Sequence, residues 1–201
     1  MDSDLRRRRL EELVPRVAEG MRLNQENRPD EAKEVLRECW NEAKVWHCTS
    51  AFIAWQLAIS FDLLGNPVVA LRFIGEALRL DPFPAPFRAS CEIIVANARR
   101  KLAQLEITDP GVGGIVRGLA RVGAVTVDDH LLLARHHSER GLHEEALVAA
   151  DAALALDPEC QAAQFARAAI TAGMRWSLLR GKEEDGLAFA QALGNSTIGE
   201  A

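Results

Sequence analysis

Apolar and polar positions follow the period of an α-helix along most of this chain. The stretch from Val127 to Cys160 shows two apolar faces, separated by Gly141 and closed by Pro158. Glycine suits a tight turn that needs a positive φ, and proline ends a helix because it lacks an N–H donor. The stretch therefore predicts two helices joined by a tight turn. Their apolar faces consist of Leu131, Leu133 and Ala134, and then Leu142, Ala146, Ala150 and Ala153.

The same arrangement recurs between Ala51 and Pro84. Two helices approach closely only where side chains are short, so small residues at fixed spacing indicate a helix pair. The recurring slots hold Ala58, Gly65, Ala70, Ala77 and Pro82 in this stretch, and Ala134, Gly141, Ala146, Ala153 and Pro158 in the other. A weaker copy runs from 13 to 46, with Gly20, Leu23, Ala32 and Leu36 in place but Cys39 and Lys44 where Ala and Pro are expected.

These units resemble the tetratricopeptide repeat, a helix pair of about 34 residues. The resemblance covers 13–46, 51–84 and 127–160. Segment 85–126 is predicted to be a lengthened, divergent helix–turn–helix unit. End helices are expected over 161–193, where they would cover the open face of the last repeat, and 194–201 is expected to be a flexible tail.

The resemblance implies an all-α fold. The expected architecture is a right-handed superhelical α-solenoid of antiparallel helix pairs with a C-terminal solvating helix, forming a single domain over 1–193. Roughly three-quarters of the residues should be helical, with no sheet. Composition agrees, because the chain is 48 % hydrophobic but only 5 % aromatic, which favours a core of close-packed Ala, Leu and Val.

Charge and cysteine content narrow the range of partners and compartments. The net charge of −5 gives no overall basic surface for nucleic acid. The four cysteines lie singly, without a CxxC motif, and are expected to be reduced thiols. No secretory signal opens the chain and no apolar run approaches a membrane span, so we expect a soluble, cytoplasmic protein without membrane contact.

Four consecutive arginines, Arg6 to Arg9, allow two interpretations. They could form a solvated first helical turn that is partly paired with Glu11 and Glu12, or an arm for RNA or anionic lipid. The first interpretation is favoured, because carboxylates stand at helical spacing and no aromatic residues are interleaved.

Catalytic chemistry is not indicated. No pair of histidines shows the i, i+4 spacing of a helical zinc site, and no Cys/His cluster has the spacing of metal ligands. The glycines between Asp109 and Gly114 lack the Gly-Lys-Ser/Thr ending of a phosphate-binding loop. We therefore expect no enzyme activity, cofactor or metal.

The resemblance implies a binding groove instead, because the first helices of successive repeats line a concave surface in this family. The residues carried over to that groove are Val14, Val17, Met21 and Asn24 in the first copy, Phe52, Trp55, Ile59 and Asp62 in the second, and Asp128, Leu131, Arg135 and Ser138 in the last. The Lys and Asn of the family's carboxylate clamp are missing. Trp40, Trp46 and Trp55 crowd the first junction between repeats, where packing is favoured over ligand stacking.

An apolar groove with charged positions at its rim favours an adaptor or scaffold that binds an amphipathic helix or apolar peptide of a partner protein. Two other classes stay open. The chain could be a structural protein that self-assembles into homo-oligomers, or a ligand-regulated sensor or enzyme that uses the groove Trp and His residues. The groove could also be covered by the chain's own N-terminal or C-terminal helix.

Overall fold

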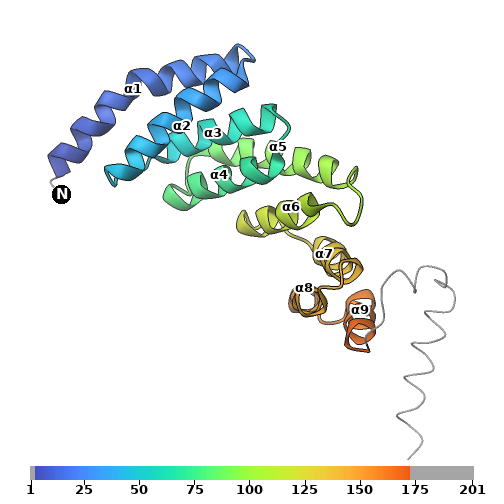
Figure 1. The fold of residues 1–201 in the computed structure, drawn as a ribbon. Helices are drawn as coiled ribbons and strands as arrows, with labels where there is room; N and C mark the ends of the chain where they lie inside the picture. Colours follow the sequence, from blue (N-terminus) through green and yellow to red (C-terminus); the bar gives the residue numbers. More distant parts are fainter. Residues whose placement is uncertain (1–2, 173–201) are drawn as a thin grey trace, which may run out of the picture. The chain divides into compact units, whose positions relative to one another are not determined.

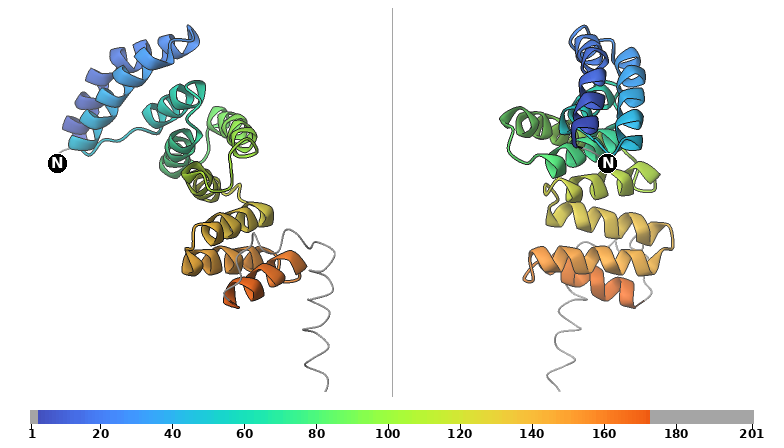
Figure 2. Two further views of the ribbon diagram at one scale, coloured as in Figure 1. Left: turned by 45° about the vertical axis from the view of Figure 1, so that its right-hand side comes forward. Right: turned by 90° about the vertical axis from the view of Figure 1, so that its left-hand side faces the viewer.

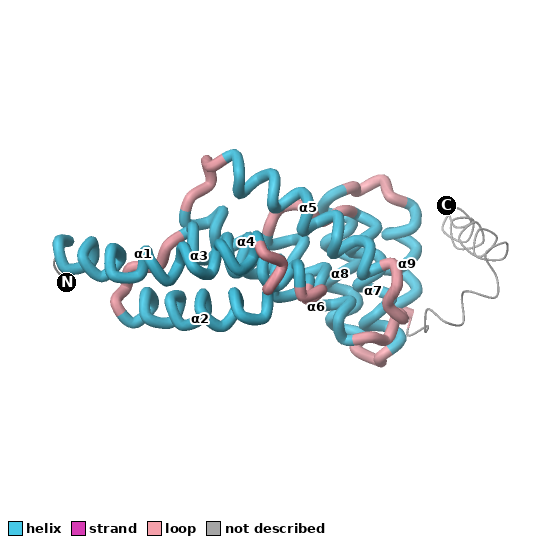
Figure 3. Tube along the Cα trace, turned by 90° about the horizontal axis from the view of Figure 1, so that it is seen from above, coloured by secondary structure: helices cyan, strands magenta, loops and turns pink. Residues whose placement is uncertain are grey.

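The computed structural model describes residues 3–172, and the regular structure of that part of the chain is entirely helical (Figures 1 and 3). Helices cover 79 % of the described residues, and no strand occurs among them, which confirms the all-α prediction. The helices are α1 (Ser3–Gln25), α2 (Pro29–Val45), α3 (Ala51–Leu63), α4 (Pro67–Leu80), α5 (Ala85–Leu102), α6 (Pro110–Arg121), α7 (Val127–Glu139), α8 (His143–Leu156) and α9 (Gln161–Thr171).

The chain divides into two compact units. Within the described residues, the first comprises 3–105 and 117–124, and the second comprises 106–116 and 125–172. The boundary falls within α6, so the last part of that helix belongs to the first unit. The single domain over 1–193 remains a prediction, and each unit is described by itself.

In the first unit, successive helices pack side by side. α1 lies against α2, α3 lies against both α2 and α4, and α5 packs on α4 and α3 (Figures 1 and 2). Leu36, Leu57, Leu71 and Ile74 form the centre of this core and are fully buried. Gly118 of α6 packs on Leu71 so closely that an added Cβ would lie 2.8 Å from the Leu71 Cβ. A small residue is therefore required at that crossing.

In the second unit, α7, α8 and α9 stack on one another (Figure 2). Thr126 caps α7, accepting a bond from the Asp129 N–H while the Asp129 carboxylate accepts from the Thr126 N–H and hydroxyl. The buried His136 ring forms a hydrogen bond through Nδ1 with the Ile107 carbonyl oxygen at 2.5 Å. The contacts between these helices are made largely by alanine side chains. The fully buried alanines are Ala134, Ala146, Ala150, Ala153, Ala163 and Ala166.

One turn geometry recurs between paired helices. Asn27, Gly65 and Gly141 all have positive φ, of 57°, 68° and 74°, and each stands two residues before the next helix. In each turn the following N–H donates to a carbonyl five residues back, at 2.9 Å in all three cases. This is the helix-ending arrangement that favours glycine. The prediction that Gly141 occupies a positive-φ turn is confirmed.

The end helices expected over 161–193 are described only in part. α9 ends at Thr171, where Ala172 adopts a non-helical ψ of 4°. Residues 173–193 of that expectation and the tail expected at 194–201 lie outside the described residues.

Candidate functional site

The first unit contains an apolar cleft of about 450 Å³ between α1 and the start of α3. Leu13 and Val17 are buried at its floor, whereas Val14 is 60 % exposed and Phe52 is 38 % exposed. Ser50 is the only polar residue among those that line it. The lining residues are Leu10, Leu13, Val14, Val17, Ala18, Met21, Ser50, Phe52 and Ile53, and together they are called the apolar cleft below.

The cleft follows from the unequal lengths of two neighbouring helices. α1 has 23 residues and α3 has 13. Near its end α1 is bonded to the middle of α3, where the Asn24 side chain contacts Gln56 and Ser60. The N-terminal half of α1 therefore extends past the start of α3, and its apolar face has no helix of the same length to cover it.

The apolar stripe of α1 has the spacing and length of a helix-binding surface. From Leu10 to Met21 it spans three helical turns, or about 16 Å at ~1.5 Å per residue. An amphipathic partner helix docks through apolar side chains at positions i, i+3 or i+4, and i+7. These side chains repeat along its axis with the same spacing as the stripe on α1. A volume of about 450 Å³ falls within the range of binding cavities, roughly 300–1,000 Å³.

Arginines at the start of α1 are largely paired within their own helix. Arg7 pairs with Glu11 at 3.1 Å and Arg9 pairs with Glu12 at 2.7 Å. The Arg9 guanidinium also lies 4.9 Å from the centre of the Trp46 ring. These contacts agree with the interpretation of a solvated, internally paired first turn for Arg7 and Arg9, while Arg8 is exposed.

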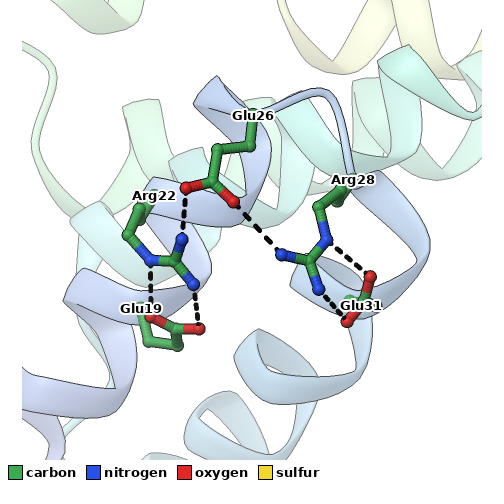
Figure 4. Close-up of polar contacts among 5 residues, drawn as sticks. All are labelled: Glu19, Arg22, Glu26, Arg28 and Glu31. Atoms are coloured by element: carbon green, nitrogen blue, oxygen red, sulfur yellow. Dashed lines mark hydrogen bonds and ion pairs between the residues drawn. The ribbon is translucent and has the colours of Figure 1, made fainter.

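At the other end of α1, five charged residues form a surface network across the turn to α2 (Figure 4). Arg22 binds Glu19 and Glu26, and Arg28 binds Glu26 and Glu31. Hydrogen bonds from Arg22 lower the pKa of Glu19, and those from Arg28 lower the pKa of Glu31. Since all of these groups face solvent, we expect a modest, salt-sensitive contribution that steadies the turn beside the Asn24 anchor.

The structure brings together four of the residues that the sequence assigned to the groove. Val14, Val17, Met21 and Phe52 line the apolar cleft. Trp55 instead faces α5, where its Nε1–H donates to the Ser90 hydroxyl at 2.9 Å and its ring lies 5.1 Å from that of Phe87. Trp55 therefore joins two helices and is not among the residues that line the cleft, although its ring lies 5.3 Å from that of Phe52.

The remaining predicted groove residues lie elsewhere. Ile59 is partly buried on α3, one turn beyond Trp55. Asp62 is half-buried and accepts a hydrogen bond from Asn97 of α5 at 2.7 Å. Burial raises the pKa of Asp62, against opposing effects of Asn97 and Arg100. The four predicted residues of the last copy lie on α7, in the second unit. Asp128 is exposed, Leu131 and Arg135 are partly exposed, and Ser138 is buried.

Several cleft residues were not among those predicted. Leu10 and Leu13 belong to the apolar face of α1, but the repeat frame began at Leu13 and placed the groove on later positions. Ser50 and Ile53 flank Phe52 at the start of α3, and Ala18 completes the stripe. The helical spacing from Leu10 onward was the available signal, because it extends the stripe beyond the repeat.

Among residues 3–172, no group of three or more His, Cys, Asp or Glu side chains is placed to hold a metal ion. Within the same range, no helix is both long and apolar enough to cross a membrane. The four cysteines are free thiols, with Cys39 and Cys48 buried.

Comparisons with known proteins assign the chain to no family, so its function is inferred from the geometry described above. The chain matches no protein-family model, and neither a curated protein nor a solved structure is significantly similar to it.

Proposed function

We propose that this protein is an adaptor whose apolar cleft binds the apolar face of an amphipathic helix from a partner protein. The observation that carries the proposal is the open apolar cleft of about 450 Å³ between the Leu10–Met21 stripe of α1 and Phe52, with Val14 and Phe52 exposed at its rim. A largely apolar cavity of this size is typical of a binding site.

Exposed arginines beside the cleft indicate which charge the partner helix should carry. Arg7 and Arg8 stand exposed one turn before Leu10, and the Arg7 side chain is 81 % accessible despite its pairing with Glu11. Acidic residues at one end of the bound helix would lie near this basic end and steer association. The proposed ligand is therefore an amphipathic helix of about three turns with acidic residues at one end.

The wider architecture that we propose is a tetratricopeptide-like solenoid with right-handed superhelical winding of its helix pairs. The recurrent turns at Asn27, Gly65 and Gly141 support this proposal, since they give three helix pairs the same closing geometry. The small residues Ala70 and Ala146 at equivalent contacts, both fully buried, support it further.

A photo-crosslinking experiment tests the adaptor. The full chain would carry a photoreactive phenylalanine at Val14 or, as a control, at Val45, an exposed valine of α2 outside the cleft. The expected result is a crosslink at the first position alone to an amphipathic segment of another protein. A synthetic peptide of that segment should then bind the wild type and the Val45→Asp variant but not the Val14→Asp variant.

Two outcomes would overturn the proposal. A crosslink from Val14 to a second copy of this chain, with a mass that rises with concentration, would assign the cleft to self-assembly instead. Equal binding of the peptide by folded Val14→Asp and Val45→Asp would place the partner elsewhere.

A further inference from the structure

A second cavity of the first unit, about 340 Å³ in volume, is formed by α2, α4 and the end of α6. Trp40 and Phe73 contribute aromatic surface to it, with ring centres 5.9 Å apart in an edge-to-face contact. Both rings are largely buried, so they expose only part of their edges. The lining residues are Trp40, Lys44, Arg72, Phe73, Glu76 and Arg121, called the basic pocket below.

Positive charge dominates this pocket. Lys44, Arg72 and Arg121 come from three different helices, and Glu76 is the only acid among the lining residues. Arg79 already engages the Glu76 carboxylate through two hydrogen bonds, at 2.7 and 2.9 Å. The three cations therefore line one cavity whose single carboxylate is held by a fourth.

Carboxylates lie close to none of these three cations. Among residues 3–172, none of the three forms an ion pair within 4.0 Å, although acidic residues outnumber basic ones by 29 to 24 in the whole chain. Lys44 acts on Glu76 at longer range, since its charge helps to lower the pKa of that carboxyl. Other arginines of the same unit, such as Arg16 and Arg28, each bind two carboxylates. Repulsion among like charges around one cavity is relieved when an anion binds between them.

Helix dipoles account for only part of this arrangement. Lys44 and Arg121 stand in the last turns of α2 and α6, where a cation is stabilised by the helix C-terminus. Arg72 lies inside α4, where no such effect acts, and its guanidinium is held 4.8 Å from the Phe73 ring centre. Gly75 makes room for Arg121, whose Cγ lies 3.2 Å from the place that a Cβ would take.

We propose that the basic pocket binds a phosphate monoester. The phosphate would lie among Lys44, Arg72 and Arg121, and the carbon body of the ester would lie against the edges of Trp40 and Phe73. A phosphate monoester carries a charge of about −1.5 to −2 and three acceptor oxygens, which suits a cavity lined by three cationic side chains better than a singly charged carboxylate does. Guanidinium groups bind phosphate through paired hydrogen bonds.

Calorimetric titration of the full chain with phenyl phosphate tests the proposal. Arg72→Gln and Arg121→Gln should each weaken binding about tenfold or more. Arg37→Gln is the matched control, because Arg37 is an exposed arginine of α2 outside the pocket and its loss changes the net charge equally. That variant should bind within about twofold of the wild type, and circular dichroism would verify that all variants are folded.

Further arms identify the source of the phosphate. Phenyl phosphate should bind more tightly than inorganic phosphate, because only the ester reaches the aromatic edges. Tighter binding of a phosphotyrosine peptide than of phenyl phosphate would assign the pocket to a phosphorylated protein, and equal binding would assign it to a small phosphate ester. Failure of all three probes to saturate the protein by about 10 mM, or equal weakening by Arg37→Gln, would overturn the proposal.

Discussion

The Ser60 hydroxyl of α3 donates a hydrogen bond to the Asn24 side-chain oxygen of α1 at 2.8 Å, with both residues buried. The Asn24 amide donates to the Gln56 carbonyl oxygen at 3.0 Å, so both the oxygen and the NH₂ group of this side chain are hydrogen-bonded. This pair fixes how far α1 extends past α3. The length of the apolar cleft therefore depends on a polar contact that lies outside it.

Asn24→Leu should lower the free energy of unfolding by about 1–3 kcal/mol, because it removes the hydrogen bonds that Asn24 makes with the buried Ser60 hydroxyl and the Gln56 carbonyl oxygen. Urea unfolding would measure the loss. Gln25→Leu, at the exposed neighbouring position, should change stability by less than about 0.5 kcal/mol. Equal stability of the two variants would show that the contact contributes little.

Gly118→Ala should destabilise the first unit by about 1–3 kcal/mol, because the new methyl group would collide with Leu71 at its Cβ, close to the backbone. Ala120→Leu adds a larger group on the exposed side of the same helix and should be nearly neutral. Thermal unfolding of both variants would make the comparison. A Gly118→Ala protein that melts with the wild type would mean that α4 and α6 can separate at no cost.

His47→Gly should stabilise the protein by about 1 kcal/mol, because His47 follows α2 with a φ of 53°, a conformation that costs side-chain-bearing residues about 1–2 kcal/mol. The exposed imidazole loses few contacts on removal. His47→Ala keeps a Cβ and is expected to bring no such gain. A lower melting temperature for His47→Gly than for His47→Ala would contradict the prediction.

The raised pKa of Asp62 predicts a stability that depends on pH. Burial makes the folded state hold the Asp62 proton to a higher pH than the unfolded chain, whose value is near 3.8. Between these two values the folded state binds more protons, so the free energy of unfolding falls as pH rises through the window. Asp62→Asn removes this effect.

The Asp62→Asn variant should accordingly gain stability relative to the wild type when the pH rises from about 3.5 to 7. Urea titrations at both pH values would measure the change, with Glu92→Gln on the exposed face of α5 as a control for general charge effects. A difference between Asp62→Asn and wild type that does not vary with pH would argue against burial as the dominant influence on this carboxyl.

Much of the fold could be predicted because its signals are local. Small residues such as Ala70 and Ala146 marked helix contacts, and Gly65 and Gly141 marked the turns, since each reflects a short-range steric requirement. Asn27 takes the same turn conformation without being glycine. Its equivalence was therefore harder to recognise from the sequence.

The candidate site was only partly predictable, because it depends on contacts between distant residues. Spacing placed Phe52 and Trp55 on one helix, but their roles diverge because Ser90 and Phe87 of α5 engage the tryptophan. Nothing in the local pattern reveals which neighbour a side chain will meet. The cavity that joins Trp40, Arg72 and Arg121 from three helices was missed for the same reason.

The alanine contacts of α7, α8 and α9 affect how readily these helices unfold locally. Among the largest fully buried side chains, these three helices contribute only His136, whereas α2, α3 and α4 contribute Leu36, Leu57, Leu71 and Ile74. An alanine removes far less apolar surface from water than a leucine, at about 25 cal/mol per Å². Backbone amides of α7–α9 should therefore exchange with deuterated solvent through local opening, ahead of those in α2–α4.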